Sequence, residues 1–383
     1  MNNQHLHTHT DYTDGYGTAE VLIGEAIRRG EKYMLKNYDL KWLDKSISEY
    51  CEEKKIFGVM RITCRDKIIF EKNIGYANIE TKEHFTEKSV FSFYSLSKPY
   101  CVIGLLRLKD LGLVDIDAHP SVYVPEAKGF DKRVTIRHIL HHISGLPDFE
   151  RITEFSEKYK PGYAKFTREH MKLLVNYPQY FEPGTRGFYA NINIILCALI
   201  IENVTGITYA EYMKKYVFEP LGMKSAVVDN EELFVENRVQ GYALKDGEAV
   251  AVDKSHDWLL GAGDIVGTVD DVYALNKAIK HRLILSEETW REALTPSPHN
   301  NMGMGCYVTN WHNKTRVNHN GGHAGFRTLH IHLLEDDFDV IFLSNSGYGS
   351  AREDLAEVIH TCFFGDDDTV NAEIKMDQGY AKT

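Results

Sequence analysis

Ser95 and Lys98 are residues whose types and spacing could do chemistry. They belong to the run Ser95-Leu96-Ser97-Lys98, which follows the β-like segment 90–94 and meets an apolar-periodic segment predicted as a helix over 97–111. If Ser95 opens that helix, the two side chains share one face with Cβ atoms about 5 to 6 Å apart. A serine nucleophile needs a nearby base at neutral pH. Serine is also a common helix cap, so the pair alone does not define an active site.

Two further motifs follow in order along the chain. Tyr189-Ala190-Asn191 comes after Pro183-Gly184 and opens an apolar helix, and His319-Asn320-Gly321-Gly322 lies on a predicted strand. The separations from Ser95 to Tyr189 (189 − 95 = 94) and from Tyr189 to His319 (319 − 189 = 130) leave room for a helical insertion between a first helix and a returning strand. Taken singly, such a tyrosine or histidine is usually a packing residue. Their order predicts one shared site.

The surrounding elements are read from hydrophobic periodicity. An amphipathic helix is expected over 40–54, followed by a β-hairpin made of 57–64 and 67–78. From Ser95 to about residue 255 the pattern is helical, with helices predicted at 97–111, 135–143, 167–176, 191–205 and 208–218. After Gly261-Ala262-Gly263 we expect a helix near 268–281, strands at 303–310, 314–319, 326–334 and 338–344, and a closing helix at 351–363.

Strands at both ends of a helical middle predict an α/β protein in which a helical domain is inserted into a sheet domain. The expected sheet domain consists of 34–94 and 260–365, and the mostly helical domain of 95–259. Residues 1–33 are expected to form an N-terminal extension, with Met34 as a plausible original start, and 366–383 a C-terminal tail.

Composition narrows the classes of partner. With 44 basic and 55 acidic residues among 383, the formal charge of −11 disfavours nucleic acid and anionic membranes. No stretch approaches 18 uninterrupted apolar residues, and the first twenty positions lack the apolar core of a signal peptide. The six cysteines are scattered singly, without zinc-site spacing. We therefore expect a cytoplasmic protein with reduced thiols.

With these motifs in this order, the chain resembles the serine β-lactamase and penicillin-binding-protein superfamily, specifically its class C β-lactamase-like branch. That branch has S-x-x-K, then Y-x-N, then a K/H-x-G strand. Supporting phrases over roughly residues 38 to 363 include VTIRHILHHISGLPD, FEPGTRGFYANINIILCALIIENVTG and GAGDIVGTVDDV. The resemblance implies a β-lactamase/transpeptidase-like fold, in which an antiparallel sheet flanked by helices carries an inserted helical domain and the active site lies between them.

The resemblance also implies roles for single residues. Ser95 would be the nucleophile, and either Lys98 or Tyr189 the working base. Asn191 would hydrogen-bond Lys98 and the substrate acyl amide, while the backbone N–H groups of Ser95 and Gly322, in the Gly321-Gly322 segment, would form the oxyanion hole. An exposed lysine has a pKa near about 10.4 and would be protonated, so Lys98 is expected to be partly buried or close to other positive charge.

The third motif departs from the common K-T-G form. His319 replaces the lysine and Asn320 replaces the threonine whose hydroxyl contacts a substrate carboxylate, which disfavours β-lactam turnover. His319 is expected to titrate near neutral pH and to add a pH-dependent positive charge. Arg327 is expected either to bind a substrate carboxylate or to be a plain surface residue.

These observations predict a serine hydrolase that cleaves a small ester, an amide or a D-amino-acid peptide through an acyl-enzyme on Ser95. No metal or cofactor is expected in the reaction. The absence of an export signal favours an intracellular esterase or amidase. The alternative is a penicillin-binding, DD-peptidase-like or β-lactamase protein with slow or no β-lactam turnover.

A second, weaker signal lies at the N-terminus. His5-Leu6-His7-Thr8-His9 is similar to the opening of the PHP (polymerase and histidinol phosphatase) phosphoesterases, whose H-x-H strand supplies two metal ligands, here His7 and His9. The match covers only about thirty residues, and two histidines are too few for a zinc-like site. We expect no working metal site there. His138, His141 and His142 also have ligand-like spacing, but they fall at a predicted helix end and are expected to be structural.

Overall fold

The structure is a computed structural model, which describes residues 39–152, 168–230, 233–252, 259–323, 325–346 and 351–364. The expected N-terminal extension with His7 and His9, and the expected tail 366–383, lie outside these residues.

A six-stranded antiparallel sheet runs in the order β2-β1-β11-β10-β9-β8. Its strands are β1 (Gly58–Cys64), β2 (Lys67–Ile74), β8 (Tyr307–Trp311), β9 (Lys314–His323), β10 (Phe326–Leu333) and β11 (Phe338–Ser344). Arg65 and Asp66 join β1 to β2 with φ of +50° and +62°, the double left-handed geometry of a tight hairpin turn. β1 pairs with β11, with Gly58 opposite Ser344. The predicted sheet built from both ends of the chain is confirmed.

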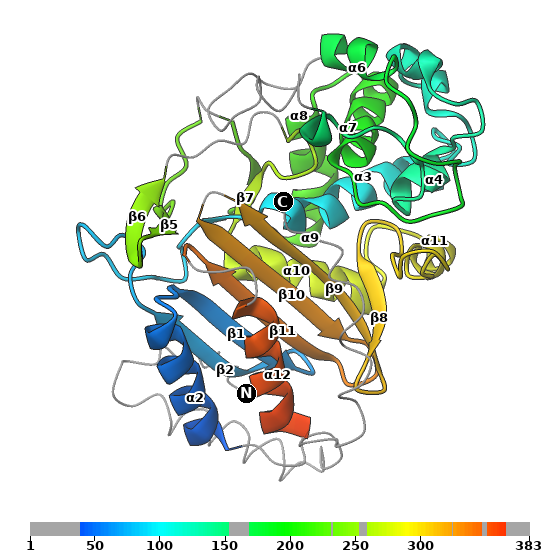
Figure 1. Cartoon of the computed structure of the whole chain (residues 1–383). Coiled ribbons are helices and arrows are strands. Elements are labelled where there is room, and N and C mark those ends of the chain that lie inside the picture. Colours follow the sequence, from blue (N-terminus) through cyan, green and yellow to red (C-terminus); the bar gives the residue numbers. More distant parts are fainter. Residues whose placement is uncertain are drawn as a thin grey trace.

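Helices cover both faces of this sheet (Figure 1). α2 (Leu40–Glu53) and α12 (Ala351–Phe364) lie on one face, and α10 (Val269–His281) lies on the other. α2 buries Leu40, Leu43, Ile47 and Cys51, which recur at three- and four-residue steps. These side chains pack with β1, β10, β11 and α12 into one apolar cluster, while the other face of the sheet shares a larger core with the middle of the chain.

The middle of the chain supplies mostly helices and short helical turns. They are η1 (Tyr94–Ser97), α3 (Lys98–Asp110), η2 (Pro120–Val122), η3 (Pro125–Gly129), α4 (Ile136–Leu140), η4 (Phe149–Arg151), α6 (Arg168–Leu174), α7 (Asn191–Thr205), α8 (Tyr209–Met213), the π-type turn η5 (Lys214–Phe218) and α9 (Glu219–Leu221). α7 is buried at every position from 191 to 201 and packs on α3. A helix buried on all sides belongs in a protein core, which explains its uninterrupted apolar run over 194–201.

The prediction of a helical pattern up to residue 255 is wrong in two places. β4 (Val227–Val228) joins β3 (Phe91–Ser92) and β7 (Ile265–Gly267) in a three-stranded sheet. β5 (Gly241–Lys245) and β6 (Glu248–Val252) form a separate hairpin. Asp246-Gly247, with φ of +53° and +83°, forms its turn, and Asp-Gly is a hairpin signal in sequence.

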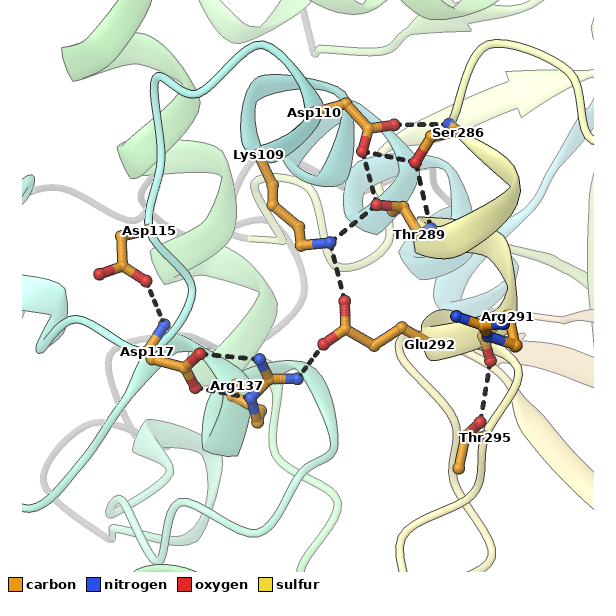
Figure 2. A network of polar contacts seen from close by, with 10 residues as sticks. All are labelled: Lys109, Asp110, Asp115, Asp117, Arg137, Ser286, Thr289, Arg291, Glu292 and Thr295. Atoms are coloured by element: carbon orange, nitrogen blue, oxygen red, sulfur yellow. Dashed lines mark hydrogen bonds and ion pairs between the residues drawn. The ribbon is translucent and has the colours of Figure 1, made fainter.

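A polar network fixes α11 (Glu287–Ala293) against the helices of the middle segment (Figure 2). Glu292 forms ion pairs with Arg137 of α4 and with Lys109 of α3. Lys109 Nζ lies 2.8 Å from Glu292 Oε2. Asp110 at the end of α3 accepts the backbone N–H of Ser286, the N-cap of α11, at 2.6 Å. Partly buried ion pairs in a network contribute more than isolated surface pairs. The network therefore ties the chain that leads into β8 to α3 and α4.

All six cysteines are unpaired. Within the described ranges, no single helix is long and apolar enough to cross a membrane. α7 followed by the segment Tyr209–Leu221 meets that test only as a pair bent by 84°.

β9 packs directly on the turn that carries Ser95. A Cβ atom at Gly321 would lie 2.0 Å from the carbonyl oxygen of Phe93 and 3.1 Å from the backbone nitrogen of Leu96. The hydroxyl of Thr328, on the neighbouring strand, donates to the same Phe93 carbonyl at 3.2 Å. Only glycine allows this approach, so Gly321 sets the distance between the third motif and Ser95.

We expect Gly321→Ala to lower the free energy of unfolding by about 2 to 3 kcal/mol, because the added methyl meets backbone that cannot move aside. Gly322→Ala is the matched control, because its Cβ would meet only the flexible side chain of Arg327, at 3.0 Å. Its expected cost is below about 1 kcal/mol. Urea denaturation of both variants measures the difference, and equal losses would contradict the close approach.

Candidate active site

The structure brings Ser95 and Lys98 together. Ser95 lies in η1 and Lys98 is the first residue of α3, with 3.0 Å between Ser95 Oγ and Lys98 Nζ. The expected contact between the two side chains is confirmed, although a 3₁₀ turn rather than the helix itself holds Ser95. Tyr94, directly before Ser95, has φ of +48° and is fully buried, a strained conformation for an aromatic residue. Such strain persists only where the surrounding packing imposes it.

Lys98 is completely buried, which a lysine tolerates only with polar partners. Besides Ser95, its Nζ donates to the carbonyl oxygen of Ala262 at 2.7 Å. Burial lowers the pKa of Lys98 to about 7, while the negative charges of Glu150 and Asp148 oppose that shift. The neutral amine is therefore populated near physiological pH, and the expected burial of this lysine is confirmed.

The Ala262 carbonyl is presented by a tight glycine turn. Gly261 has φ of +71°, and a Cβ there would lie 2.9 Å from Cys101 Sγ on α3 and 3.0 Å from Ala198 Cβ on α7. The turn thus enters the seam between the two buried helices. The backbone N–H of Ile265, just beyond it, donates to Ser97 Oγ at 3.0 Å, which fixes η1 to β7.

Tyr189 lies two residues before α7 and reaches the same amine. Lys98 Nζ is 4.8 Å from the centre of the Tyr189 ring. The ring also stacks on His142, with centroids 4.7 Å apart and planes inclined by 9°. The second motif is therefore beside the first, as its position in the sequence predicts.

Asn191 differs from the expectation. Its backbone N–H donates to Asp148 Oδ2 at 3.1 Å, and its Nδ2 donates to Glu150 Oε2 at 2.7 Å. The expected hydrogen bond to Lys98 is not formed among the described residues. Asn191 Nδ2 is directed at Glu150, and Oδ1, the atom that would accept from the Lys98 amine, has no hydrogen-bond partner there. Burial raises the pKa of Asp148 to about 7. Asn191 thus links the start of α7 to two carboxylates that act electrostatically on Lys98.

His319 lies on β9, but its predicted charge is wrong. It is buried, its ring centroid is 6.0 Å from that of Tyr189, and burial together with the Lys98 charge lowers its pKa to about 3. The imidazole is therefore neutral at physiological pH. Its Nδ1 lies 2.7 Å from the carbonyl oxygen of Asn320, which assigns the proton to Nδ1 and leaves a lone pair on Nε2.

Gly322 and Arg327 face each other across the β9–β10 pair. The backbone of Gly322 is exposed, unlike that of Gly321. The Arg327 side chain passes beside Gly322 and donates from Nη1 to the Phe326 carbonyl at 2.6 Å. Arg327 is thus half-buried next to the third motif rather than a plain surface residue.

Sequence reasoning missed four residues of this site. Ala262 lies in the GAGD phrase, and His142, Asp148 and Glu150 lie in or just after HHISGLPD. These phrases carried part of the family resemblance, but no site role was assigned to Ala262, Asp148 or Glu150, and His142 was expected only to be structural. A buried lysine requires an acceptor and a neighbouring charge, and that requirement could have directed attention to both phrases.

Possible metal ligands gather at a different place in the described ranges. His332, Asp337 and Asp339, at the β10–β11 turn, place one ligand atom each within 4.8 Å of the others. His332 Nδ1 lies 2.6 Å from Asp339 Oδ1, and Asp337 forms an ion pair with Lys280. These contacts account for the cluster without a metal ion.

Comparison with known proteins relates this arrangement to other chains. A penicillin-binding protein of Bacillus subtilis (strain 168) is 29% identical, covering 73% of this chain and 65% of the relative. A D-aminopeptidase of Gluconobacter oxydans is 23% identical over 75% of this chain and 55% of the relative. Esterase EstB of Burkholderia gladioli is 24% identical over 66% of this chain and 72% of the relative. The chain thus spans less than two thirds of the length of the first two relatives.

Solved structures share the fold. A penicillin-binding protein homologue from Pyrococcus abyssi superposes with a TM-score of 0.73 at 25% identity, covering 84% of this chain and 77% of that chain. A class C beta-lactamase superposes with a TM-score of 0.70 at 21% identity, covering 85% and 96%. The fold is therefore β-lactamase/transpeptidase-like, as expected. Because the Beta-lactamase family profile matches residues 43–361 as well, the chain belongs to the beta-lactamase family.

Proposed function

We propose that the protein is a serine hydrolase that cleaves a small ester, an amide or a D-amino-acid peptide through an acyl-enzyme on Ser95. The observation that carries this proposal is the 3.0 Å contact between the Ser95 hydroxyl and a fully buried lysine whose pKa is about 7. A neutral amine at that distance can accept the hydroxyl proton at physiological pH. The site lies where the helical middle of the chain meets β9 of the sheet.

The proposed reaction uses these residues in the following order. Lys98 takes the proton of Ser95 Oγ as the oxygen attacks the substrate carbonyl carbon, and the carbonyl oxygen becomes an oxyanion. Backbone N–H groups of Ser95 and Gly322 stabilise that charge, a contribution typically worth about 3 to 4 kcal/mol. Collapse expels the alcohol or amine, which takes the proton back from Lys98, directly or through Tyr189. Water then attacks the acyl-enzyme and gives a proton to the same base. Collapse of this second tetrahedral intermediate breaks the bond to Ser95 Oγ, which takes that proton back, and releases the acid.

The third motif supports this substrate class. His319 is neutral and Asn320 has no hydroxyl, so β9 offers neither a fixed cation nor a threonine for the carboxylate of a β-lactam. Arg327 beside Gly322 supplies the positive charge instead for any anionic group on the substrate. An esterase and a D-aminopeptidase among the relatives are consistent with this range.

The second candidate is a penicillin-binding protein that is acylated but turns over slowly. The similarity to a penicillin-binding protein of Bacillus subtilis favours it. Both candidates share an acyl-enzyme on Ser95 and differ in its lifetime, so the two are separated by the rate at which the enzyme is regenerated.

Ser95→Ala should abolish p-nitrophenyl ester hydrolysis, because the lost oxygen forms the covalent bond. It should also abolish labelling by a fluorophosphonate and by a fluorescent penicillin, with the thermal melting temperature unchanged within a few degrees. Peptide mapping of the labelled wild type should place the adduct on Ser95. Retention of more than about a tenth of wild-type kcat would exclude this nucleophile, and stable penicillin labelling without ester turnover would favour the second candidate.

The acidic limb of kcat/KM should lie near pH 7, because below the Lys98 pKa the ammonium cannot accept the serine proton. Asp148→Asn should move that limb to lower pH, because Asp148 raises the pKa of Lys98 and its amide replacement carries no charge. Lys98→Arg, which stays protonated, should lower kcat by about 100-fold or more. A wild-type limb above pH 9, or a shift to higher pH in Asp148→Asn, would contradict the proposed base.

His319→Gln should reduce kcat/KM by about tenfold. This corresponds to the loss of one hydrogen bond made by the His319 imidazole during the reaction, worth about 1.4 kcal/mol. The position of the acidic limb should stay the same, because a neutral side chain replaces a neutral imidazole. Full pH profiles with a neutral ester test this. A limb that moves by more than about half a pH unit would show that His319 carries charge during turnover.

A further inference from the structure

His142 forms hydrogen bonds with the backbone on both sides of Tyr189. Its carbonyl oxygen accepts the backbone N–H of Phe188 at 2.8 Å, and its Nδ1 accepts the backbone N–H of Ala190 at 3.1 Å. Between these two anchors the Tyr189 ring stacks on the imidazole at 4.7 Å. Three separate contacts from one residue therefore fix the backbone before Tyr189, the backbone after it and the plane of its ring.

The imidazole itself is held in one orientation. Asn193 Oδ1 accepts the Ser144 hydroxyl at 2.7 Å, which turns Asn193 Nδ2 towards His142 Nδ1 at 3.1 Å. Because Nδ1 accepts hydrogen bonds, the proton of the neutral ring lies on Nε2. Burial, reinforced by the Lys98 charge, keeps the pKa of His142 well below its usual value. The contribution of His142 is therefore one of geometry rather than of charge.

The backbone of His142 is strained to permit these contacts. Its φ is +53° and its side chain is completely buried. Non-glycine residues with positive φ are uncommon, and they persist where the surrounding structure imposes them, often at functional sites. Directly after α4, this conformation points both the carbonyl and the ring at the 188–190 segment.

Neighbouring histidines make other contacts. His138 accepts the backbone N–H of Thr135 at the start of α4, and His141 Nδ1 lies 3.0 Å from the Met302 carbonyl. Both are only half-buried. His141 is therefore a matched control for His142, since it shares its position at the end of α4 and its side-chain type.

We propose that His142 is a positioning residue for Tyr189, which holds the phenol beside Lys98 in the geometry that proton transfer requires. This inference rests on the proposed function, because it assigns Tyr189 to the proton network of Ser95. It goes beyond the structural role expected from the HILHHISGL phrase, since three contacts of His142 fix Tyr189 and the backbone on either side of it.

A double-mutant cycle between His142→Asn and Tyr189→Phe tests the proposal. Asparagine tolerates a positive φ and retains an acceptor for the Ala190 N–H, but it has no ring. We expect His142→Asn to lower kcat for a p-nitrophenyl ester by about 10- to 100-fold with KM within about threefold, because a small misplacement of a catalytic group has effects of this size. In the Tyr189→Phe background the same change should cause no further loss. His141→Asn should stay within about twofold of wild type.

Several results would overturn the proposal. Wild-type kcat in a folded His142→Asn variant would show that the contacts of the His142 ring with the 188–190 segment are unimportant for catalysis. An equal loss in the presence and absence of the Tyr189 hydroxyl would show that His142 acts elsewhere, and it would leave the proposed function intact. Full activity of Tyr189→Phe would overturn the role of both residues. His142→Phe keeps an aromatic ring for stacking but has no acceptor for the Ala190 N–H, so the same cycle with this variant tests the hydrogen bond separately. A loss of kcat seen with Tyr189 present but not in Tyr189→Phe would support the proposal again.

Discussion

Burial of the Lys98 amine is the constraint on which the rest of the site depends. Removing an ammonium from water costs several kcal/mol, and this cost is reduced when the buried group loses its proton and becomes neutral. Burial alone would lower the pKa further, but the carboxylates of Glu150 and Asp148 oppose it, and the balance leaves the pKa at about 7. The Ala262 carbonyl accepts one of the two hydrogens of the neutral amine and leaves the nitrogen lone pair free to act as the base.

This balance requires groups that are far apart in the sequence. The amine comes from the start of α3, its carbonyl acceptor from the loop before β7, its carboxylates from the segment after α4, and its aromatic neighbour from the start of α7. α3 and α7 pack along one seam, and the Gly261 turn enters it. β9 closes the site because Gly321 allows the strand to touch the backbone of Phe93. The sheet therefore closes a site whose side chains come mostly from the helices and the loops beside them.

Local patterns predicted the parts of this arrangement that depend on neighbouring residues. The spacing of Ser95 and Lys98 predicted their contact, and the apolar steps from Leu40 to Ile47 predicted α2. The partner of Asn191 could not be predicted, because Glu150 reaches it only through the loop that follows α4. The β5–β6 hairpin was missed although Asp246-Gly247 is a hairpin turn signal, because the helical pattern was extended to residue 255.

The charge of His319 also could not be predicted from local sequence, and its neutral state affects the pKa of Lys98. Its residue type predicts titration near pH 6.5, but its pKa falls to about 3 because segments distant in the sequence bury it near Lys98. A fixed cation at this position would repel the Lys98 ammonium, since two like charges a few ångströms apart in a poorly solvated site interact by several kcal/mol. The pKa of Lys98 would then fall below the value that burial and the two carboxylates set. With histidine there, and with His142 also neutral, neither imidazole carries a charge that would oppose protonation of Lys98 during proton transfer. The imidazoles contribute shape and hydrogen-bonding atoms, and they leave the pKa of the base close to physiological pH.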